Sequence, residues 1–307
     1  MSTSDASRPS DLSCQQRARK SRFIEIFRTT PPKTVCPNFF VLSHANGCAF
    51  MPRCRYCYLK SSFWYLSAPL AFSNVDQMVR EVEAWIARDE LETYILNSGN
   101  LSDSLAFEQT RPAMARLVEV FRQKAEAAGR PHSLLLVTKG GLHECRTLLE
   151  TAPCRNVIVS FSINNDQAAK DHEPGAPPSA ERLEAARRLR ERGWRLRLRM
   201  DPMIEGYDYV ETARQVKAAR PERVTLGTLR AEAGLLRLGE DGLFDELEKP
   251  TEERAMARYP LGRRLALYRQ ATGVLLPEVP VALCEETLDV WLALGLNPDA
   301  RACNCGI

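Results

Sequence analysis

Three cysteines lie close together in the segment GCAFMPRCRYCYL, residues 47–59. Cys48, Cys54 and Cys57 have the spacing C-x5-C-x2-C and follow an apolar run that is typical of a buried strand. Three thiolates at such spacing can hold a metal. A structural zinc ion normally takes four protein ligands, whereas three cysteines suit a four-iron cluster whose remaining iron is open to an exogenous ligand. We therefore expect these three thiols to be metal ligands.

The segments around this loop alternate between short apolar runs and amphipathic helical patterns. The expected strands span residues 38–43, 94–96, 134–138, 156–163, 194–200 and 223–226, and the expected helices span 75–88, 111–128, 142–150, 179–192 and 209–219. Ser179 is the expected N-cap of its helix, and Gly193 the residue that ends it. Repeated strand–helix units predict an α/β fold with a parallel sheet, either open or closed into a barrel. The cysteine loop then lies at the carboxyl edge of the sheet, where α/β proteins carry their sites.

The chain divides into three regions. Residues 1–33 form a polar arm with a basic run (Arg17, Arg19, Lys20 and Arg22), interpreted either as a solvated tail or as a phosphate-contacting arm. Residues 34–230 carry the strand–helix units. Residues 231–307 form a C-terminal extension with expected helices at 261–271 and 286–294, a strand at 279–284, and the cysteine-rich end RACNCGI.

Composition excludes several classes of protein. Of the 307 residues, 44% are hydrophobic, which excludes wholesale disorder, and the net charge of 42 − 39 = +3 excludes a strongly basic nucleic-acid binder. No apolar run approaches the ~18 residues of a membrane span. The N-terminus has no apolar signal region, so we expect a cytoplasmic protein without membrane partners. Ten cysteines in such a protein indicate metal ligands or reactive thiols before disulfides.

The cysteine loop resembles that of the radical S-adenosylmethionine superfamily. The commonest pattern there is C-x3-C-x2-C with an aromatic residue before the third cysteine, as Tyr56 precedes Cys57 here; the first gap is two residues longer in this chain. Three further segments, LLVTKG, VSFSIN and EPGAPPSAERLEAARRLRERGWRLRLRMDPMI, resemble the spore photoproduct lyase family and occur in the family's order. The resemblance covers roughly residues 38–230.

This resemblance implies a fold, cofactors and partners. The fold would be a partial (β/α)6 barrel of the TIM type with a C-terminal α/β extension. Cys48, Cys54 and Cys57 would hold a [4Fe-4S] cluster whose open iron binds the amino and carboxylate groups of S-adenosylmethionine. An electron from a flavodoxin- or ferredoxin-type protein would then break a carbon–sulfur bond of this cosubstrate and produce a carbon radical.

Several residues match the family's functional positions. Lys139 and Ser162 match positions that contact the cosubstrate, and Asn164 and Asn100 are further candidates on the same edge. A lysine there can pair with a carboxylate and a serine can donate a hydrogen bond, although a solvated surface charge is the alternative for Lys139.

Two tyrosines and an aspartate are candidate catalytic residues. Tyr56 and Tyr58 flank Cys57 and match tyrosines that return a hydrogen atom in the photoproduct lyases; the alternative is that they pack against the cluster. Asp103 could hydrogen-bond the cosubstrate or substrate, or could cap the next helix.

The chain also departs from the family. Asn100 precedes Leu101-Ser102-Asp103, where the photoproduct lyases carry a hydrogen-donating cysteine, and an amide is a poor hydrogen-atom donor beside a thiol. Cys303 and Cys305 near the C-terminus, together with Cys284, could bind a second cluster or a thiophilic substrate such as trivalent arsenic. One of these thiols could instead replace the missing donor, or all three could be without function.

Three functions remain open on this basis. The first is a radical enzyme acting on a small, thiophilic molecule, including transfer of an aminocarboxypropyl group. The alternative is a DNA photolesion repair lyase, for which Arg195, Arg197 and Arg199 could form a basic face along one strand unless their stems cover a helix. The third is a non-enzymatic iron–sulfur or zinc protein.

Overall fold

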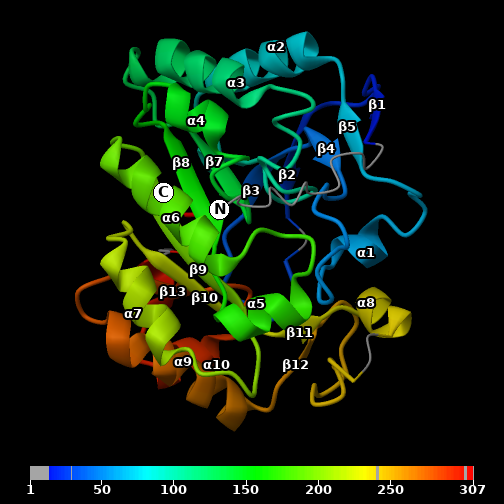
Figure 1. Cartoon of the computed structure of the whole chain (residues 1–307), viewed down its shortest axis with the longest axis vertical. Coiled ribbons are helices and arrows are strands. Elements are labelled where there is room, and N and C mark those ends of the chain that lie inside the picture. Colours follow the sequence, from blue (N-terminus) through cyan, green and yellow to red (C-terminus); the bar gives the residue numbers. More distant parts are fainter. Residues whose placement is uncertain (1–13, 29, 240–241, 301–302, 307) are drawn as a thin grey trace, which may run out of the picture.

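The computed structural model describes residues 14–28, 30–239, 242–300 and 303–306. Its centre is an eight-stranded sheet in the order β13-β10-β9-β8-β7-β6-β3-β2 (Figure 1). The strands are β2 (Ile24–Phe27), β3 (Phe39–Leu42), β6 (Ile95–Asn97), β7 (Ser133–Thr138), β8 (Val157–Ser162), β9 (Arg195–Met203), β10 (Val224–Thr228) and β13 (Val281–Leu283). All neighbouring pairs are parallel except β2–β3. The predicted α/β class with a parallel sheet is therefore confirmed, and the strand of the C-terminal extension continues the same sheet.

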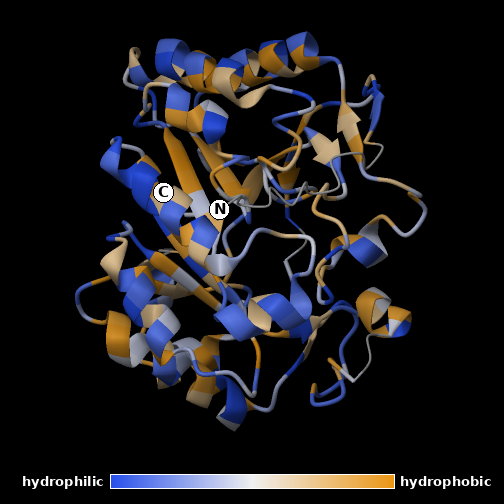
Figure 2. Ribbon diagram, viewed as in Figure 1, coloured by the Kyte–Doolittle hydropathy of each residue, from blue (hydrophilic) through white to orange (hydrophobic). Residues whose placement is uncertain are grey.

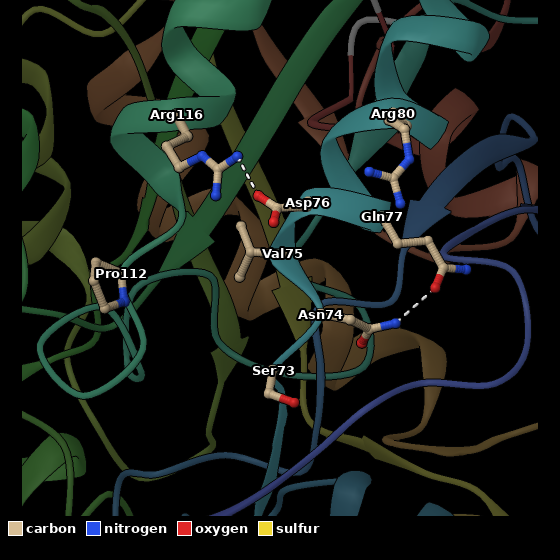
Figure 3. Close-up of a pocket in the computed structure, with 8 residues that line it drawn as sticks. All are labelled: Ser73, Asn74, Val75, Asp76, Gln77, Arg80, Pro112 and Arg116. Atoms are coloured by element: carbon tan, nitrogen blue, oxygen red, sulfur yellow. Dashed lines mark hydrogen bonds and ion pairs between the residues drawn. The ribbon is translucent and has the colours of Figure 1, made fainter.

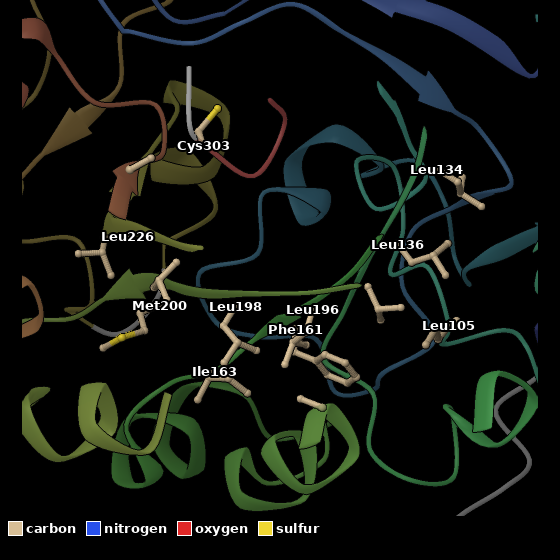
Figure 4. Packing of buried hydrophobic residues seen from close by; sticks show 14 of the residues in the cluster. Leu105, Leu134, Leu136, Phe161, Ile163, Leu196, Leu198, Met200, Leu226 and Cys303 are labelled. Atoms are coloured by element: carbon tan, nitrogen blue, oxygen red, sulfur yellow. The ribbon is translucent and has the colours of Figure 1, made fainter. Parts of the chain in front are cut away.

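Helices cover one face of this sheet (Figure 1). They are α2 (Val75–Ile86), α3 (Met114–Phe121, continued as a π-helix over Arg122–Glu126), α4 (Arg146–Glu150), α6 (Ser179–Glu191), α7 (Val210–Ala218), α9 (Leu261–Leu275) and α10 (Leu288–Ala293). Alternation along the strands supplies the apolar surface: Leu196 and Leu198 of β9 join the same buried cluster as Leu183 and Leu189 of α6. Figure 4 shows Phe161, Leu196 and Leu198 in this layer. The hydropathy colouring shows the same division, with apolar strands inside and polar outer helix faces (Figure 2).

The sheet does not close into a barrel. No ladder joins its outer strands β2 and β13 in the described part of the chain. Instead, an isolated bridge between Thr34 and Thr287, with a hydrogen bond from the Val35 N–H to the Glu286 carbonyl at 2.8 Å, links the segment before β3 to the segment after β13. The expected partial TIM-type barrel is not confirmed, because β2 runs antiparallel along the edge that closure would need.

Smaller elements flank the cysteine loop. A three-stranded sheet contains β1 (Gln15–Arg17), β5 (Leu70–Phe72) and β4 (Ala45–Asn46), and β11 (Arg230–Ala231) pairs with β12 (Ala257–Arg258). The remaining helices are α1 (Leu59–Ser62), α5 (Asp166–His172), α8 (Ala233–Leu238) and a 3-10 turn at Pro298–Ala300. No helix among the described residues is long and apolar enough to span a bilayer.

Two local expectations have different outcomes. Residues 14–28 of the expected arm contribute to sheets, with Phe23 fully buried, whereas residues 1–13 lie outside the described part. Helix α6 has Pro178 as its N-cap, so the assignment of Ser179 as the cap is wrong: the Ser179 hydroxyl accepts a hydrogen bond from the Asn164 N–H at 3.2 Å. Gly193, with φ +97°, follows the C-cap as predicted.

Candidate cofactor site

The three cysteines lie in one loop between β4 and α1. All three are free, half-buried thiols, and the loop is tied by a hydrogen bond from the Gly47 N–H to the Leu101 carbonyl at 2.9 Å. Burial raises the pKa of each thiol, that of Cys54 to about 12. Because a thiol must lose its proton to bind a metal, ligation by this loop is coupled to proton release.

The donor set of the cysteine loop consists of soft thiols, which suit an iron–sulfur cluster. Among residues 14–28, 30–239, 242–300 and 303–306, no group of three or more histidine, cysteine or acidic side chains is placed to hold one metal ion. Each thiolate of a four-iron cluster binds a different iron, so its ligands need not converge on one point. Three soft thiol donors in one loop suit iron–sulfur ligation.

The segment that follows α5 packs against the cysteine loop. Gly175 lies against it so closely that a Cβ there would be 2.4 Å from the Met51 carbonyl carbon and from the Pro52 oxygen. A further hydrogen bond runs from the Arg55 N–H to the His172 carbonyl at 2.8 Å. Only a glycine permits this approach, which explains the glycine of the E-P-G segment.

Glu173 connects the segment after α5 to the cysteine loop. Its carboxylate, 2% exposed, accepts hydrogen bonds from the Tyr56 hydroxyl and from the Asn164 amide at 3.1 Å. It also forms a fully buried ion pair with Arg182, with 2.5 Å between Oε2 and Nη2. The charges of Arg182 and Lys139 hold the pKa of Glu173 below its usual value, although burial alone would raise it. Sequence reasoning missed Glu173 and Arg182, for which the E-P-G segment was the available signal.

The expected cosubstrate residues lie on neighbouring strand ends. Lys139 follows β7, and its ammonium is 5.6 Å from the centre of the Tyr56 ring. Burial alone would lower its pKa, but the charge of Glu173 raises it, so the lysine is cationic. Ser162 ends β8 beside it, as predicted from the strand pattern.

The side chain of Asn164 makes two hydrogen bonds within the protein. Its amide group donates to Glu173, and its oxygen accepts from the Tyr209 hydroxyl at 3.0 Å. The side chain therefore belongs to the network beneath the loop, and its contacts favour support of Glu173 over contact with a cosubstrate.

Asp103 ties two strand ends together. Its carboxylate accepts hydrogen bonds from the Lys139 N–H (2.7 Å), the Thr138 hydroxyl (2.8 Å), the Leu105 N–H (2.9 Å) and the Ala106 N–H (3.1 Å). Four donors occupy both oxygens, so the geometry favours the capping alternative over a contact with substrate. The Asp103 carboxylate caps the turn that follows β6. It also holds the backbone at Lys139 in place.

The two tyrosines point to different partners. Tyr56 donates inward to Glu173, whereas the hydroxyl of Tyr58, a residue 42% exposed, donates to the backbone carbonyl of Asn100. Tyr58 thus contacts the loop that follows β6, at Asn100.

Comparison with known proteins identifies the family. The family model for spore photoproduct lyase matches residues 8–225 of this chain. The chain belongs to the spore photoproduct lyase family. Members of this family are radical S-adenosylmethionine proteins with a [4Fe-4S] cluster, which confirms the expected family and cofactors.

Individual relatives are more distant. Spore photoproduct lyase of Bacillus subtilis (strain 168) is 26% identical over 189 residues, which are 60% of this chain and 53% of the relative. The chain thus spans about half the length of that curated relative. A solved mutant of spore photoproduct lyase with dinucleoside spore photoproduct has a TM-score of 0.69 and 18% identity, covering 88% of this chain and 81% of that one. A second mutant, with bound AdoMet and the same dinucleoside, has a TM-score of 0.68, 18% identity and coverage of 89% and 81%.

The C-terminal thiols do not meet as a group of three in this family member. Cys284 follows β13, with its sulfur 3.3 Å from Arg199 Nη2 and 3.4 Å from Arg230 Nη2. Cys303 and Cys305 instead line, with Cys36, a cavity of about 610 Å³ at the amino ends of β3 and β6. The expected grouping with Cys284 is therefore replaced by a grouping with Cys36, a cysteine for which no role is expected from the sequence.

Arg197 holds residues 304–306 against the sheet. It is fully buried on the face of β9 opposite the helices, and one guanidinium nitrogen donates to the carbonyls of Asn304 (2.6 Å) and Gly306 (2.7 Å). Arg195 pairs with Glu222, and Arg199 with Asp201. The expected basic face for DNA is wrong, because Arg197 is fully buried, Arg199 is largely buried against Asp201, and Arg195 pairs with Glu222. Their stems do not cover a helix either, because they lie on the face of β9 opposite the helices.

A second cavity, of about 520 Å³, lies at the start of α2 (Figure 3). Four of its polar side chains pair with one another, Arg116 with Asp76 and Asn74 with Gln77, each at 2.7 Å. None of the expected site residues lines it.

Proposed function

We propose that this chain reductively cleaves S-adenosylmethionine at a [4Fe-4S] cluster and acts as a repair lyase on a DNA photolesion of the spore photoproduct type. The observation that carries the proposal is the arrangement of three free thiols in one loop with the Lys139 ammonium beside Tyr56 at the edge of that loop. Family membership and the dinucleoside photoproduct bound in similar structures support this choice of substrate.

The residues of the chain have separable tasks in this reaction. Cys48, Cys54 and Cys57 would hold the cluster, which would supply the electron for cleavage of the carbon–sulfur bond. Lys139 pairs with the carboxylate of the cosubstrate, and the Ser162 hydroxyl adds a hydrogen bond. Asp103 fixes the backbone of Lys139 from behind.

Asn100 changes how hydrogen returns to the product. An amide cannot serve in place of a thiol, so another hydrogen donor must face the product radical. Tyr58 stands at this place, with its hydroxyl bonded to the Asn100 carbonyl and much of its side chain exposed. We assign the hydrogen-returning role to Tyr58, whose phenoxyl radical then regains its hydrogen as an electron from the reductant and a proton from solvent. Tyr56 has the task of positioning the loop through Glu173.

A small thiophilic substrate, such as an arsenic compound that receives an aminocarboxypropyl group, is the second candidate. The observation in its favour is Cys284, a half-buried thiol held between the guanidinium groups of Arg199 and Arg230 beyond the end of β13. The comparisons favour the photolesion over this candidate.

The test is anaerobic reconstitution with iron and sulfide, followed by reduction with dithionite in the presence of S-adenosylmethionine and dinucleoside spore photoproduct. We expect 5′-deoxyadenosine and repaired dinucleoside by mass spectrometry. Cys48→Ala should lose both, whereas Cys145→Ala, at a buried thiol of the hydrophobic core, should keep both. Methylthioadenosine would favour the second candidate, and absence of any cleavage would contradict both. A flavodoxin or ferredoxin should replace dithionite as electron donor.

A further inference from the structure

Three thiols that the proposed reaction does not use meet where the sheet stays open. Cys36, Cys303 and Cys305 line the cavity of about 610 Å³ at the amino ends of β3 and β6. All three are free cysteines. Two of them belong to the end of the chain and the third to the segment before β3. Because thiols that share a cavity can be oxidised to a disulfide, this grouping points to redox chemistry.

Cys36 lies in the segment that crosses the open seam, by which we mean the gap between the segment before β3 and the segment after β13. Thr34 forms an isolated bridge with Thr287. The Val35 N–H donates to the Glu286 carbonyl at 2.8 Å. Backbone contacts of the two preceding residues therefore fix the position of Cys36 at the seam.

The end of the chain is also fixed through its backbone. The Arg197 guanidinium donates to the carbonyls of Asn304 and Gly306. The Cys303 carbonyl accepts from the Gly306 N–H at 3.1 Å and from Arg223 Nη1 at 3.4 Å. On the side of the C-terminal segment these bonds use main-chain atoms, so a change at the Cys303 sulfur need not break them.

Cys303 is the better partner of the two C-terminal thiols for Cys36. Burial, together with repulsion from an ionised Cys303, raises the pKa of Cys36 to about 12, which indicates that the two thiols are close. The Cys305 sulfur lies 3.9 Å from Asn97 Nδ2, at the end of β6. Burial raises the pKa of Cys303 as well, but the N–H groups of Cys305 and Gly306 oppose this rise and favour its thiolate.

We propose that Cys36 and Cys303 form a reversible disulfide, a latch that joins the C-terminal segment to the start of β3 across the open seam. Each thiol loses its hydrogen as the S–S bond forms. The two electrons and two protons pass to a small disulfide such as glutathione disulfide, which leaves as two thiols, and an excess of thiol reverses the reaction. The two residues are far apart in the chain, so the bond restricts the unfolded state and stabilises the folded one. The inference goes beyond the proposed function and does not depend on it.

The test locates the disulfide in the reconstituted protein, equilibrated without oxygen at several ratios of reduced to oxidised glutathione. Iodoacetamide then blocks the remaining thiols, and trypsin releases residues 34–53 and 302–307 as separate peptides. We expect mass spectrometry to find these two peptides joined at the oxidising ratios and separate after dithiothreitol. Fragmentation of the joined peptides should place the bond between Cys36 and Cys303.

Variants and thermal unfolding test the latch independently. Cys36→Ser and Cys303→Ser should abolish the joined peptides, whereas Cys305→Ser should keep them. Cys154→Ala, at a buried thiol of the hydrophobic core, is the control and should also keep them. Oxidation should raise the Tm of the original chain by about 5 °C or more and leave that of Cys36→Ser unchanged.

Three results would overturn the latch. The first is the absence of joined peptides from the original chain at every glutathione ratio. The second is a bond from Cys36 to Cys305 that persists in Cys303→Ser. The third is the formation of joined peptides without any rise in Tm. The first and third need no variant, so they decide the matter even if a cysteine variant does not fold.

Discussion

The carboxylate of Asp103 accepts a hydrogen bond from the backbone N–H of Lys139 at 2.7 Å, joining the turn after β6 to the end of β7. The same carboxylate takes three further hydrogen bonds, so it fixes the direction in which the Lys139 side chain leaves the sheet. Asp103, which the sequence suggests for direct chemistry, therefore fixes the backbone of Lys139, the residue that we propose to contact the cosubstrate.

Replacing Asp103 by alanine should weaken both folding and cosubstrate binding. Several buried N–H and O–H donors would lose a charged acceptor, and hydrogen bonds to charged groups contribute about 1.5–3 kcal/mol each. We expect the free energy of unfolding to fall by at least about that much in urea titrations. Binding of S-adenosylmethionine to the reconstituted protein should also weaken, as measured by calorimetry. Asp76→Ala removes a carboxylate whose ion pair is exposed and should change stability by about 1 kcal/mol at most.

Glu173→Gln should destabilise the protein by leaving Arg182 charged and buried without a counter-charge. Breaking one partner of a buried ion pair costs about 3–5 kcal/mol. The double variant Glu173→Gln/Arg182→Met should recover part of that loss, because neither charge is then buried alone. Urea unfolding of both single variants and the double variant gives the coupling energy. Additive losses would contradict the direct pairing of these two residues. Glu184→Gln, in a surface pair with Arg188, is the matched control.

Arg197→Met should release the C-terminal segment from the sheet. Burial lowers the pKa of Arg197 to about 10, which still leaves it charged at neutral pH and able to hold the carbonyls of Asn304 and Gly306. Each carbonyl left without a partner costs about 1–3 kcal/mol. Alkylation of Cys305 by iodoacetamide, followed by mass spectrometry, should become faster. Unchanged alkylation would contradict this role. Arg188→Met, at an exposed side chain, should alter neither stability nor alkylation.

His44 should make the apoprotein less stable as the pH falls below neutrality. Burial, with the neighbouring charge of Arg111, lowers the pKa of His44 from 6.5 to about 3. Above pH 6.5 the folded and unfolded states both carry a neutral ring. Between pH 6.5 and about 3 only the unfolded state takes up the proton, so unfolding is favoured by up to about 1.4 kcal/mol per pH unit.

The comparison of variants isolates this effect. His44→Asn keeps an acceptor for the Arg111 guanidinium, which donates to Nδ1 at 2.9 Å, but does not titrate. Its stability measured by urea unfolding at pH 7, 6 and 5 should fall less steeply than that of the original chain. His143→Gln, at an exposed position, should keep the original slope. Equal slopes in all three proteins would contradict the assignment to His44.

Much of the sheet could be predicted from local patterns. The apolar runs at 134–138 and 156–163 became β7 and β8, because alternation and β-branched residues decide which side chains face a helix layer. The same patterns placed Lys139 and Ser162 at adjacent strand ends. The antiparallel strand β2 was not predicted, because its four residues lie in an otherwise polar arm. It forms a strand because it pairs with β3 in the folded protein, and its own residues show no strand pattern.

Local sequence patterns were enough to find the residues that can do chemistry: the three thiols of one loop, the tyrosines beside them and the lysine after β7. Their spacing is local, so it survives any arrangement of the rest of the chain. The folded structure alone shows that Asp103 accepts four internal hydrogen bonds, that Glu173 and Arg182 lie against the cysteine loop, and that Cys303 and Cys305 share a cavity with Cys36. These contacts join residues far apart in the sequence, as Arg197 and Asn304 do. Their partners are chosen by burial and by the need of each buried polar group for a hydrogen bond, which no local pattern encodes.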